Sequence, residues 1–371
     1  MNKTIKELTL FMGVFSFLFT LSFSFPFTIF FDVGGLFEPF CNQLVSLEAH
    51  LLGIEVASYH SGEDASGLYL NTVNVLFISL LVYWLLRRFL SQVQREKWMV
   101  FATVGMRYYL ALILLIYGFD KVYKWQFYAP ESNILYTRVK DLPQDMLYWT
   151  TMGTSYAYSL FAGLIEVLAG LFLLFRKSKV FGLLLSVGVL ANVFAVNIGF
   201  DITVKLFSGF LLLLSLTLLF PYLSVCYAFF TGEEARLDLS VPDYARSTYY
   251  RVSKVVILIL FLLETQFKYF VSRNFNDDLA PRAHFNGAYQ VLKGEGGIVR
   301  VHFHRGGYLI FETPEGEFID YKMTLNRQEQ RIQLIDYDLQ EHILEFIEYG
   351  DTLLLKDQKG SFSITSVKQK L

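Results

Sequence analysis

Long apolar segments fill the first 270 residues, and several of them contain an acid, a lysine or an asparagine. A helix needs about 20 predominantly apolar residues to cross a bilayer. The stretches that meet this requirement are 9–31, 69–90, 105–123, 155–175, 180–200, 203–224 and 254–271. Because lipid cannot hydrogen-bond to a polar side chain, such residues are expected to face the bundle interior. The pattern predicts a polytopic α-helical membrane bundle of about seven transmembrane helices.

Composition narrows the classes of function. The formal net charge of −2 and the lack of long basic runs argue against a nucleic-acid partner. The two cysteines, Cys41 and Cys226, have no metal-ligand spacing, and no ligand set for haem or an iron–sulfur cluster is recognisable. No nucleophile motif, phosphate loop or dinucleotide fingerprint occurs in a plausible context. No cofactor is therefore evident, although a quinone would fit a membrane site.

The distribution of lysine and arginine predicts the orientation of the bundle. The segment 32–68 contains no lysine or arginine, whereas basic residues flank alternate loops: Arg87, Arg88, Arg95, Lys97 and Arg107, then Arg176, Lys177 and Lys179, then Arg236, Arg246, Arg251 and Lys254. Basic loops stay in the cytoplasm. We therefore expect a cytoplasmic N-terminus and an extracytoplasmic segment after residue 272. The first apolar stretch is expected to be retained, because it is longer than a signal-peptide core and lacks a small-x-small cleavage site.

From Asn286 the hydrophobic period changes to two. About eight runs of four to six residues alternate with turn residues such as those at 294–297 and 305–307. This pattern predicts a small antiparallel β meander, closed as a barrel or half-barrel so that sheet edges are not exposed.

The predicted boundaries divide the chain into four parts. They are 1–104, two transmembrane helices with an outer loop at 32–68; 105–225, a four-helix membrane core; 226–285, a cytoplasmic connection, a seventh transmembrane helix and a linker; and 286–371, the extracytoplasmic β domain.

Seven polar residues from four consecutive predicted helices are candidates for a site: Asp120, Lys121, Glu166, Asn192, Asn197, Asp201 and Lys205. Glu166 lies some ten residues from Arg176, near the bilayer centre. A carboxylate there costs about 3 kcal/mol on insertion scales unless it is protonated or paired. We expect an outward-opening pocket with Glu166 at its floor. Glu166 and Lys121 are the expected catalytic residues, and the other five are expected to bind substrate.

Structural roles compete with this interpretation. Asp120 and Lys121 can simply mark a helix end at the lipid head groups. Asn192 and Asn197 can be amides that hold helices together. A salt bridge at a helix end is expected for Glu264 and Lys268, and Asp201 and Lys205 are spaced for an i to i+4 ion pair. Gly163 and Gly170 share a helix face and would let a neighbouring helix approach closely.

Three histidines are weak candidates for a metal site. His302 and His304 share one face of a predicted strand, and His284 is near in sequence. No further ligand completes the set, so no metal is expected.

The stretch from about 105 to 222 resembles the DoxX family of bacterial membrane proteins. The likeness is carried by Arg107, by Gly118-Phe119-Asp120-Lys121, by Ile165-Glu166 with Gly170, and by Asn192. The whole arrangement, including the loop Ser61-Gly62-Glu63-Asp64 and the C-terminal β domain, is similar to DoxX-like proteins of the Bacteroidota. There the loop commonly reads Ser-Gly-x-Gly-Asp, so this chain keeps only part of it. Relatives include membrane subunits of thiosulfate:quinone oxidoreductase and partners in mycobacterial redox-defence complexes.

The resemblance implies a multi-pass protein of the bacterial inner membrane with a periplasmic β domain. It also implies a redox-linked subunit, an oxidoreductase component if it is catalytic, that binds a quinone or another small amphiphile. One alternative is a non-catalytic anchor or assembly protein that presents the β domain to a periplasmic or membrane protein partner, by an open sheet edge or a barrel mouth. A small-molecule or proton-coupled transporter is a third. In each case membrane lipid is an expected partner.

Overall fold

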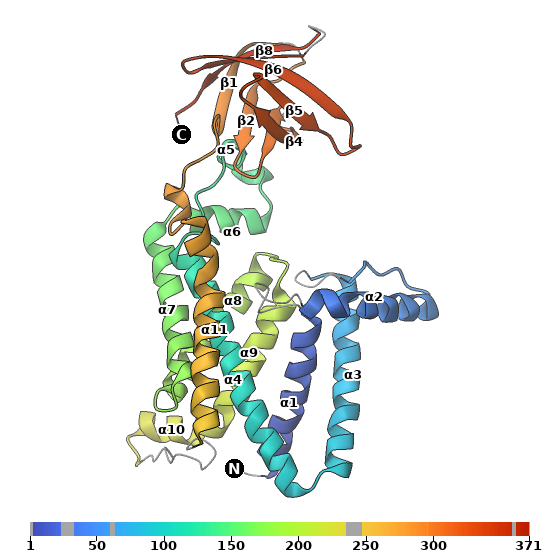
Figure 1. Cartoon of the computed structure of the whole chain (residues 1–371), viewed down its shortest axis with the longest axis vertical. Helices are drawn as coiled ribbons and strands as arrows, with labels where there is room; N and C mark the ends of the chain where they lie inside the picture. Colours follow the sequence, from blue (N-terminus) through green and yellow to red (C-terminus); the bar gives the residue numbers. More distant parts are fainter. Residues whose placement is uncertain are drawn as a thin grey trace. The chain divides into compact units, whose positions relative to one another are not determined.

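A computed structural model describes residues 3–23, 33–59, 64–234, 247–294, 296–357 and 361–370 (Figure 1). The chain forms two compact units. The helical unit comprises Met1–Gln126 and Tyr156–Asn276, and the barrel unit comprises Phe127–Ser155 and Asp277–Leu371. The segment Phe127–Ser155 was expected within the membrane core. It belongs instead with the barrel, to which its polar side chains are hydrogen-bonded.

The helices of the helical unit are α1 (Lys3–Ser22), α2 (Val33–Leu52), α3 (Ser66–Phe89), α4 (Gln92–Val122), α7 (Tyr156–Leu174), α8 (Lys179–Gly199), α9 (Lys205–Leu219), α10 (Leu223–Thr231) and α11 (Thr248–Ser272). By length and composition, seven helices of the described residues can cross a membrane, with α9 and α10 counted as one span. The predicted membrane bundle is confirmed. α4 begins well before the predicted residue 105, because the Ser91 hydroxyl and the Gln94 side chain form a capping box at its start.

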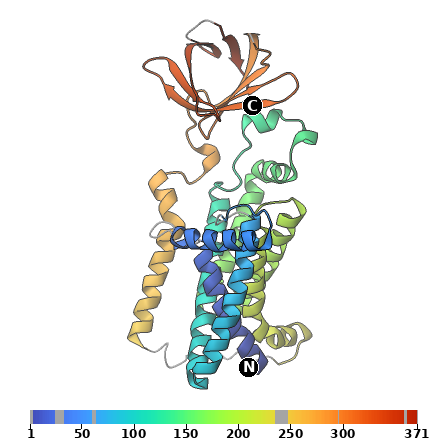
Figure 2. The same ribbon diagram turned by 90° about the vertical axis from the view of Figure 1, so that its right-hand side faces the viewer.

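Helices α4 and α7 form the closest helix pair of the bundle, α8 packs against α7 and α9, and α1 packs against α3 and α4 (Figure 2). A Cβ added to Gly163 would lie 2.6 Å from the carbonyl oxygen of Gly118, and one added to Gly170 would lie 2.9 Å from that of Ala111. The predicted close approach at Gly163 and Gly170 is therefore confirmed. We call the end of the bundle where α4 finishes and α7 begins the distal end. The end where α1 and α4 begin and α3 finishes is the proximal end.

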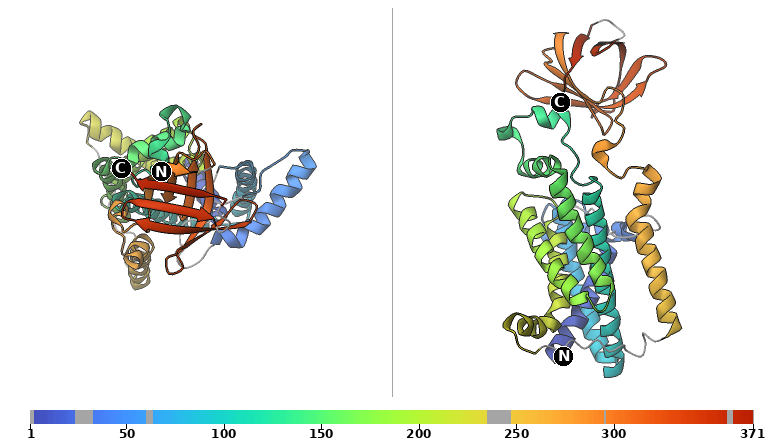
Figure 3. Two further views of the ribbon diagram at one scale, coloured as in Figure 1. Left: turned by 90° about the horizontal axis from the view of Figure 1, so that it is seen from above. Right: turned by 90° about the vertical axis from the view of Figure 1, so that its left-hand side faces the viewer.

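Helix α2 lies across the ends of α1 and α3 instead of running parallel to them (Figures 1 and 2). It occupies much of the segment that was expected to be a loop. Cys41 and Val45 are buried, whereas Leu36, Phe40, Leu47 and Leu51 are exposed along one side. An amphipathic helix of this kind is typical of the boundary between lipid and water. Helix α11 runs beside α4 (Figure 3).

The barrel has eight strands: β1 (Gly287–Gly294), β2 (Arg300–His304), β3 (Tyr308–Glu312), β4 (Phe318–Asn326), β5 (Arg331–Ile335), β6 (Glu341–Tyr349), β7 (Thr352–Asp357) and β8 (Ser363–Lys368). Each strand pairs antiparallel with the next, and β8 pairs with β1, so the barrel is closed. Val301, Phe303, Leu309 and Ile332 belong to its apolar core. The predicted meander is confirmed in its closed form, and every strand has two neighbours.

The barrel unit also contains α5 (Ser132–Tyr136), η1 (Val139–Asp141), α6 (Gln144–Gly153) and η4 (Asp277–Leu279). Helix α5 contacts β1 and β2. The backbone N–H of Ala129 donates to the Asp278 carboxylate at 2.7 Å. These contacts explain why residues far apart in the chain fold as one unit.

Candidate functional site

Lys121 and Glu166 form a buried ion pair between α4 and α7. The Lys121 Nζ donates to Glu166 Oε1 at 2.9 Å and to Oε2 at 2.7 Å. The side chains are only 8% and 5% exposed. The structure thus brings together the two residues that the sequence indicated as catalytic, and each charge is compensated by the other.

The local sequence explains how this lysine reaches the glutamate. Gly118, one turn before Lys121, allows the backbones of α4 and α7 to approach closely. The Ser159 hydroxyl of α7 donates to the carbonyl oxygen of Lys121 at 2.8 Å. The ring of Tyr117 lies 5.6 Å from the Lys121 Nζ. Lys121 is therefore fixed at its backbone and at its charged end.

Asp120, the neighbour of Lys121, faces α11. Its Oδ1 accepts from the Lys268 Nζ at 2.5 Å and from the Tyr269 hydroxyl at 2.7 Å. The sequence indicated a salt bridge for Lys268 with Glu264 on its own helix, whereas the carboxylate bound to Lys268 in these bonds comes from α4. The distal end of the bundle therefore has two adjacent charged clusters, one at α7 and one at α11.

A mixed aromatic and polar seam separates α4 from α11. The Tyr123 hydroxyl donates to Gln266 Oε1 at 3.2 Å. The Gln266 Nε2 is buried and has no hydrogen-bond partner among the described residues. The rings of Tyr123 and Trp125 pack against Tyr269, with centroid distances of 4.4 and 5.2 Å. The Gln266 amide nitrogen is thus a buried donor without a partner in an otherwise packed seam.

The remaining candidates lie on α8 and at the start of α9, in separate contacts. Asn197 Nδ2 donates to Ser208 Oγ at 2.9 Å, which joins α8 to α9. The expected ion pair between Asp201 and Lys205 is present at 2.7 Å, but Asp201 is 80% exposed. Asn192 is exposed on the surface of α8. Among the described residues no hydrogen bond joins Asn192 to Glu166, so their shared pocket stays a prediction.

Asp64 has a role that its sequence position alone did not reveal. Its carboxylate accepts from the backbone N–H groups of Lys205 at 2.5 Å and Leu206 at 3.2 Å. These are the first N–H groups of α9, which have no partner inside the helix. Asp64 thus caps α9 from a distant loop. The preceding residues of its motif, 61–63, lie outside the described residues.

A second buried polar network lies in the barrel unit, under α5. His302 Nδ1 lies 3.1 Å from Ser132 Oγ, and its Nε2 lies 3.1 Å from Glu312 Oε2. Arg300 donates to Glu312 Oε1 at 2.7 Å. Burial lowers the pKa of His302 below its usual range, although the Glu312 carboxylate acts in the opposite direction. Burial therefore favours the neutral imidazole.

This network has the order of a serine, histidine and carboxylate relay, but it is closed to substrates. Ser132 is only 3% exposed and His302 is fully buried. We interpret the network as the attachment of α5 to β2. Within the described residues, no group of three or more His, Cys, Asp or Glu side chains could hold a metal ion. The attachment could not be read from the sequence, because Ser132 and His302 are 170 residues apart.

Comparisons with known proteins give one informative relationship. No family model matches the chain, and no solved structure matches it. The chain is 32% identical over 113 residues to the uncharacterized protein YwoB of Bacillus subtilis (strain 168), which covers 30% of this chain and 71% of YwoB. Over that part of its length, the chain belongs to the same family as YwoB.

Proposed function

We propose that the helical unit binds the head group of a quinone or a similar small amphiphile at its distal end. The chain would act there as a DoxX-like subunit of a redox-linked system in the bacterial inner membrane, with a cytoplasmic N-terminus and a periplasmic barrel. The observation that carries the proposal is the buried pair of Lys121 and Glu166. Buried ionisable pairs in membrane helices mark ligand or proton pathways more often than they mark stability.

The two members of the pair have different roles in this proposal. Reduction of a quinone places negative charge on its oxygens, and the Lys121 ammonium group stabilises that charge. Glu166 carries the proton that the reduced oxygen takes up. It is the eleventh residue of α7, so it lies about 15 Å along the helix from its start. Electrons come from a partner subunit, since this sequence has no recognisable ligand set for a redox metal centre.

In this proposal the ring binds at the seam between α4 and α11, where Asp120, the neighbour of Lys121, faces α11. Asp120 and Tyr269 are hydrogen-bonded to each other across it. The unpartnered Gln266 Nε2 offers a hydrogen bond to a quinone carbonyl oxygen. Aromatic side chains on both sides provide flat apolar surface for the ring.

The test is the quinone content of the protein purified in mild detergent, measured by mass spectrometry. We expect a stoichiometric quinone in the wild type, loss of it in Glu166→Gln, and no change in Asp201→Asn, which removes the exposed acid of a surface ion pair. The double variant Lys121→Met with Glu166→Leu removes both charges without leaving one unpaired. Loss of the quinone from this variant can therefore be attributed to loss of the site and not to unfolding. A well-folded double variant that retains the quinone would refute the proposal.

A second function, an assembly protein that presents the barrel to an envelope partner, is favoured by one observation. Ile343, Ile347 and Tyr349 are all exposed at alternate positions of β6, on the outer face of the barrel. Since the barrel is closed, a partner would bind this face and not an open edge. Replacing Ile343 and Ile347 by lysine should release a co-purifying protein and leave the quinone content unchanged. If quinone is lost and the partner stays, this second function is excluded.

A further inference from the structure

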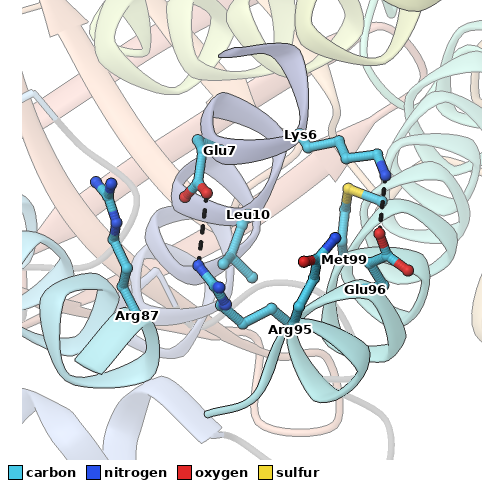
Figure 4. Close-up of a pocket in the computed structure, with 8 residues that line it drawn as sticks. Lys6, Glu7, Leu10, Arg87, Arg95, Glu96 and Met99 are labelled. Atoms are coloured by element: carbon cyan, nitrogen blue, oxygen red, sulfur yellow. Dashed lines mark hydrogen bonds and ion pairs between the residues drawn. The ribbon is translucent and has the colours of Figure 1, made fainter. Parts of the chain in front are cut away.

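A cavity of about 560 Å³ opens at the proximal end of the helical unit (Figure 4). Its charged side chains come from three helices: Lys6 and Glu7 from the first turns of α1, Arg87 from the last turn of α3, and Arg95 and Glu96 from the start of α4. It therefore involves none of the residues in the proposed quinone site.

The cavity has more positive than negative charge. Three cationic side chains and two carboxylates line it, which leaves one positive charge in excess. Lys6 is paired with Glu96 at 2.8 Å. Glu7 accepts a hydrogen bond from Tyr83 at 2.7 Å and lies 3.6 Å from Arg95. The first turn of α4 also lines the cavity through Gln92, and the positive end of a helix dipole adds to the attraction for an anion.

The hydrogen-bonding capacity of Arg95 is not fully used. Its Nε is buried and has no hydrogen-bond partner among the described residues. Glu7 lies 3.6 Å from the Nη1 atom of Arg95. The other side of the guanidinium group, with Nε and Nη2, can therefore donate to a bidentate anion. Phosphate and carboxylate groups match this fork, and phosphate also has oxygens left for a second arginine.

The position of the cavity along the helices indicates where such a phosphate is found. α1, α3 and α4 can each cross a membrane, and the charged lining residues lie within the first or last two turns of these helices, at the depth of lipid head groups. The apolar side chains of Leu10 and Met99 complete the wall.

We propose that this cavity is a phosphate-binding site in which Arg87 and Arg95 hold a phosphodiester group. A single excess positive charge matches the single negative charge of a phosphodiester. An anionic phospholipid in the membrane and a free phosphate ester in solution both supply this group. The proposal does not depend on the quinone site.

The experiment uses the full chain, purified from its membrane and analysed by native mass spectrometry and lipid extraction. We expect the wild type to retain phosphatidylglycerol in preference to phosphatidylcholine after reconstitution in mixed nanodiscs. Arg95→Gln and Arg87→Gln should each lower the retained phosphatidylglycerol about tenfold, since a hydrogen bond to a charged group is worth about that factor. Arg88→Gln is the matched control, because Arg88 is the adjacent residue of the same helix turn and does not line the cavity.

The variant Glu7→Gln tests whether Arg95 binds the phosphate or only stabilises the fold through its contact with Glu7. Removing this carboxylate raises the excess positive charge, so retention should increase several-fold, whereas a structural role predicts the same loss as in Arg95→Gln. Inorganic phosphate is the second probe. If it raises the melting temperature of the delipidated wild type but not of Arg95→Gln, and phosphatidylglycerol is not retained, the source is a soluble phosphate. Equal loss in Arg88→Gln, or no binding of either probe, would overturn the proposal.

Discussion

The ion pairs at the two ends of the helical unit differ in their exposure to solvent. At the distal end Lys121 and Glu166 are 8% and 5% exposed and are bonded to each other. At the proximal end Lys6 and Glu96 are 39% and 45% exposed and stand at the wall of an open cavity. A ligand at the distal end must compete with a partner that is already in place, so its binding is coupled to a proton or a helix movement. At the proximal end, by contrast, the Nε of Arg95 has no hydrogen-bond partner among the described residues, so a ligand can bind it without displacing one.

The largest expected effect of a single substitution is at the distal pair. Glu166→Gln leaves the Lys121 ammonium group buried without a compensating charge, which costs roughly 3–5 kcal/mol of unfolding free energy for a buried pair. The measurement is the unfolding free energy in mixed micelles, by titration with denaturing detergent. The double variant Lys121→Met with Glu166→Leu should recover most of this loss, because no buried charge remains. If both variants are equally unstable, packing and not charge dominates this end.

The second prediction tests whether the close packing of α4 and α7 keeps water away from the ion pair. Gly163→Ala places a methyl group 2.6 Å from the carbonyl oxygen of Gly118, and overpacking of this kind costs roughly 1–3 kcal/mol. The helices must separate, so the ion pair should become accessible to water, as measured by hydrogen exchange of α7. Gly188→Ala is the control, since a Cβ there meets nothing within 4 Å. Equal behaviour of the two variants would contradict the packing argument.

Sequence patterns predicted features of this fold that depend on local periodicity. The apolar runs predicted the seven spans, and the two-residue period predicted the barrel. The spacing of Gly163 and Gly170 predicted the close helix contact. The charge of Glu166 in an apolar run indicated that it is either protonated or paired, because an isolated carboxylate in lipid is costly, and the structure shows the pair. The likeness to DoxX proteins, and the redox role it implies, stays a prediction.

Features that depend on distant contacts could not be read from the sequence. Asp120 meets Lys268 across 148 residues, and Asp64 meets the start of α9 across 141. No period connects such positions. The exposure of Asn192 could not be read from the sequence either, because a residue's place along a helix does not fix which way the helix is rotated. The signal for the early start of α4, Ser91 followed three residues later by Gln94, was present in the sequence.

A third prediction concerns the cap that Asp64 forms at the start of α9. Asp64→Ala removes the oxygen atoms that bind the first N–H groups of α9, and loss of such a cap costs roughly 0.5–2 kcal/mol. Thermal unfolding followed by circular dichroism measures the change. Asp64→Asn should retain much of the stability, because an amide oxygen can also cap a helix. A full loss with asparagine would show that the negative charge, and not the hydrogen bond, stabilises α9.

The smallest expected effect is at the proximal pair. Lys6→Gln breaks an ion pair that water already screens, so the unfolding midpoint should move little. In about 1 M salt, where the Debye length is about 3 Å, the wild type and the variant should be indistinguishable, while the large effect of Glu166→Gln should persist because water and ions do not reach it. Lys6→Gln also cancels the excess positive charge of the cavity, so it should weaken phosphate retention without loosening the bundle. A variant that loses stability and ligand together would mean that the proximal charges hold the helices in place, and the contrast between the two ends would then be one of degree.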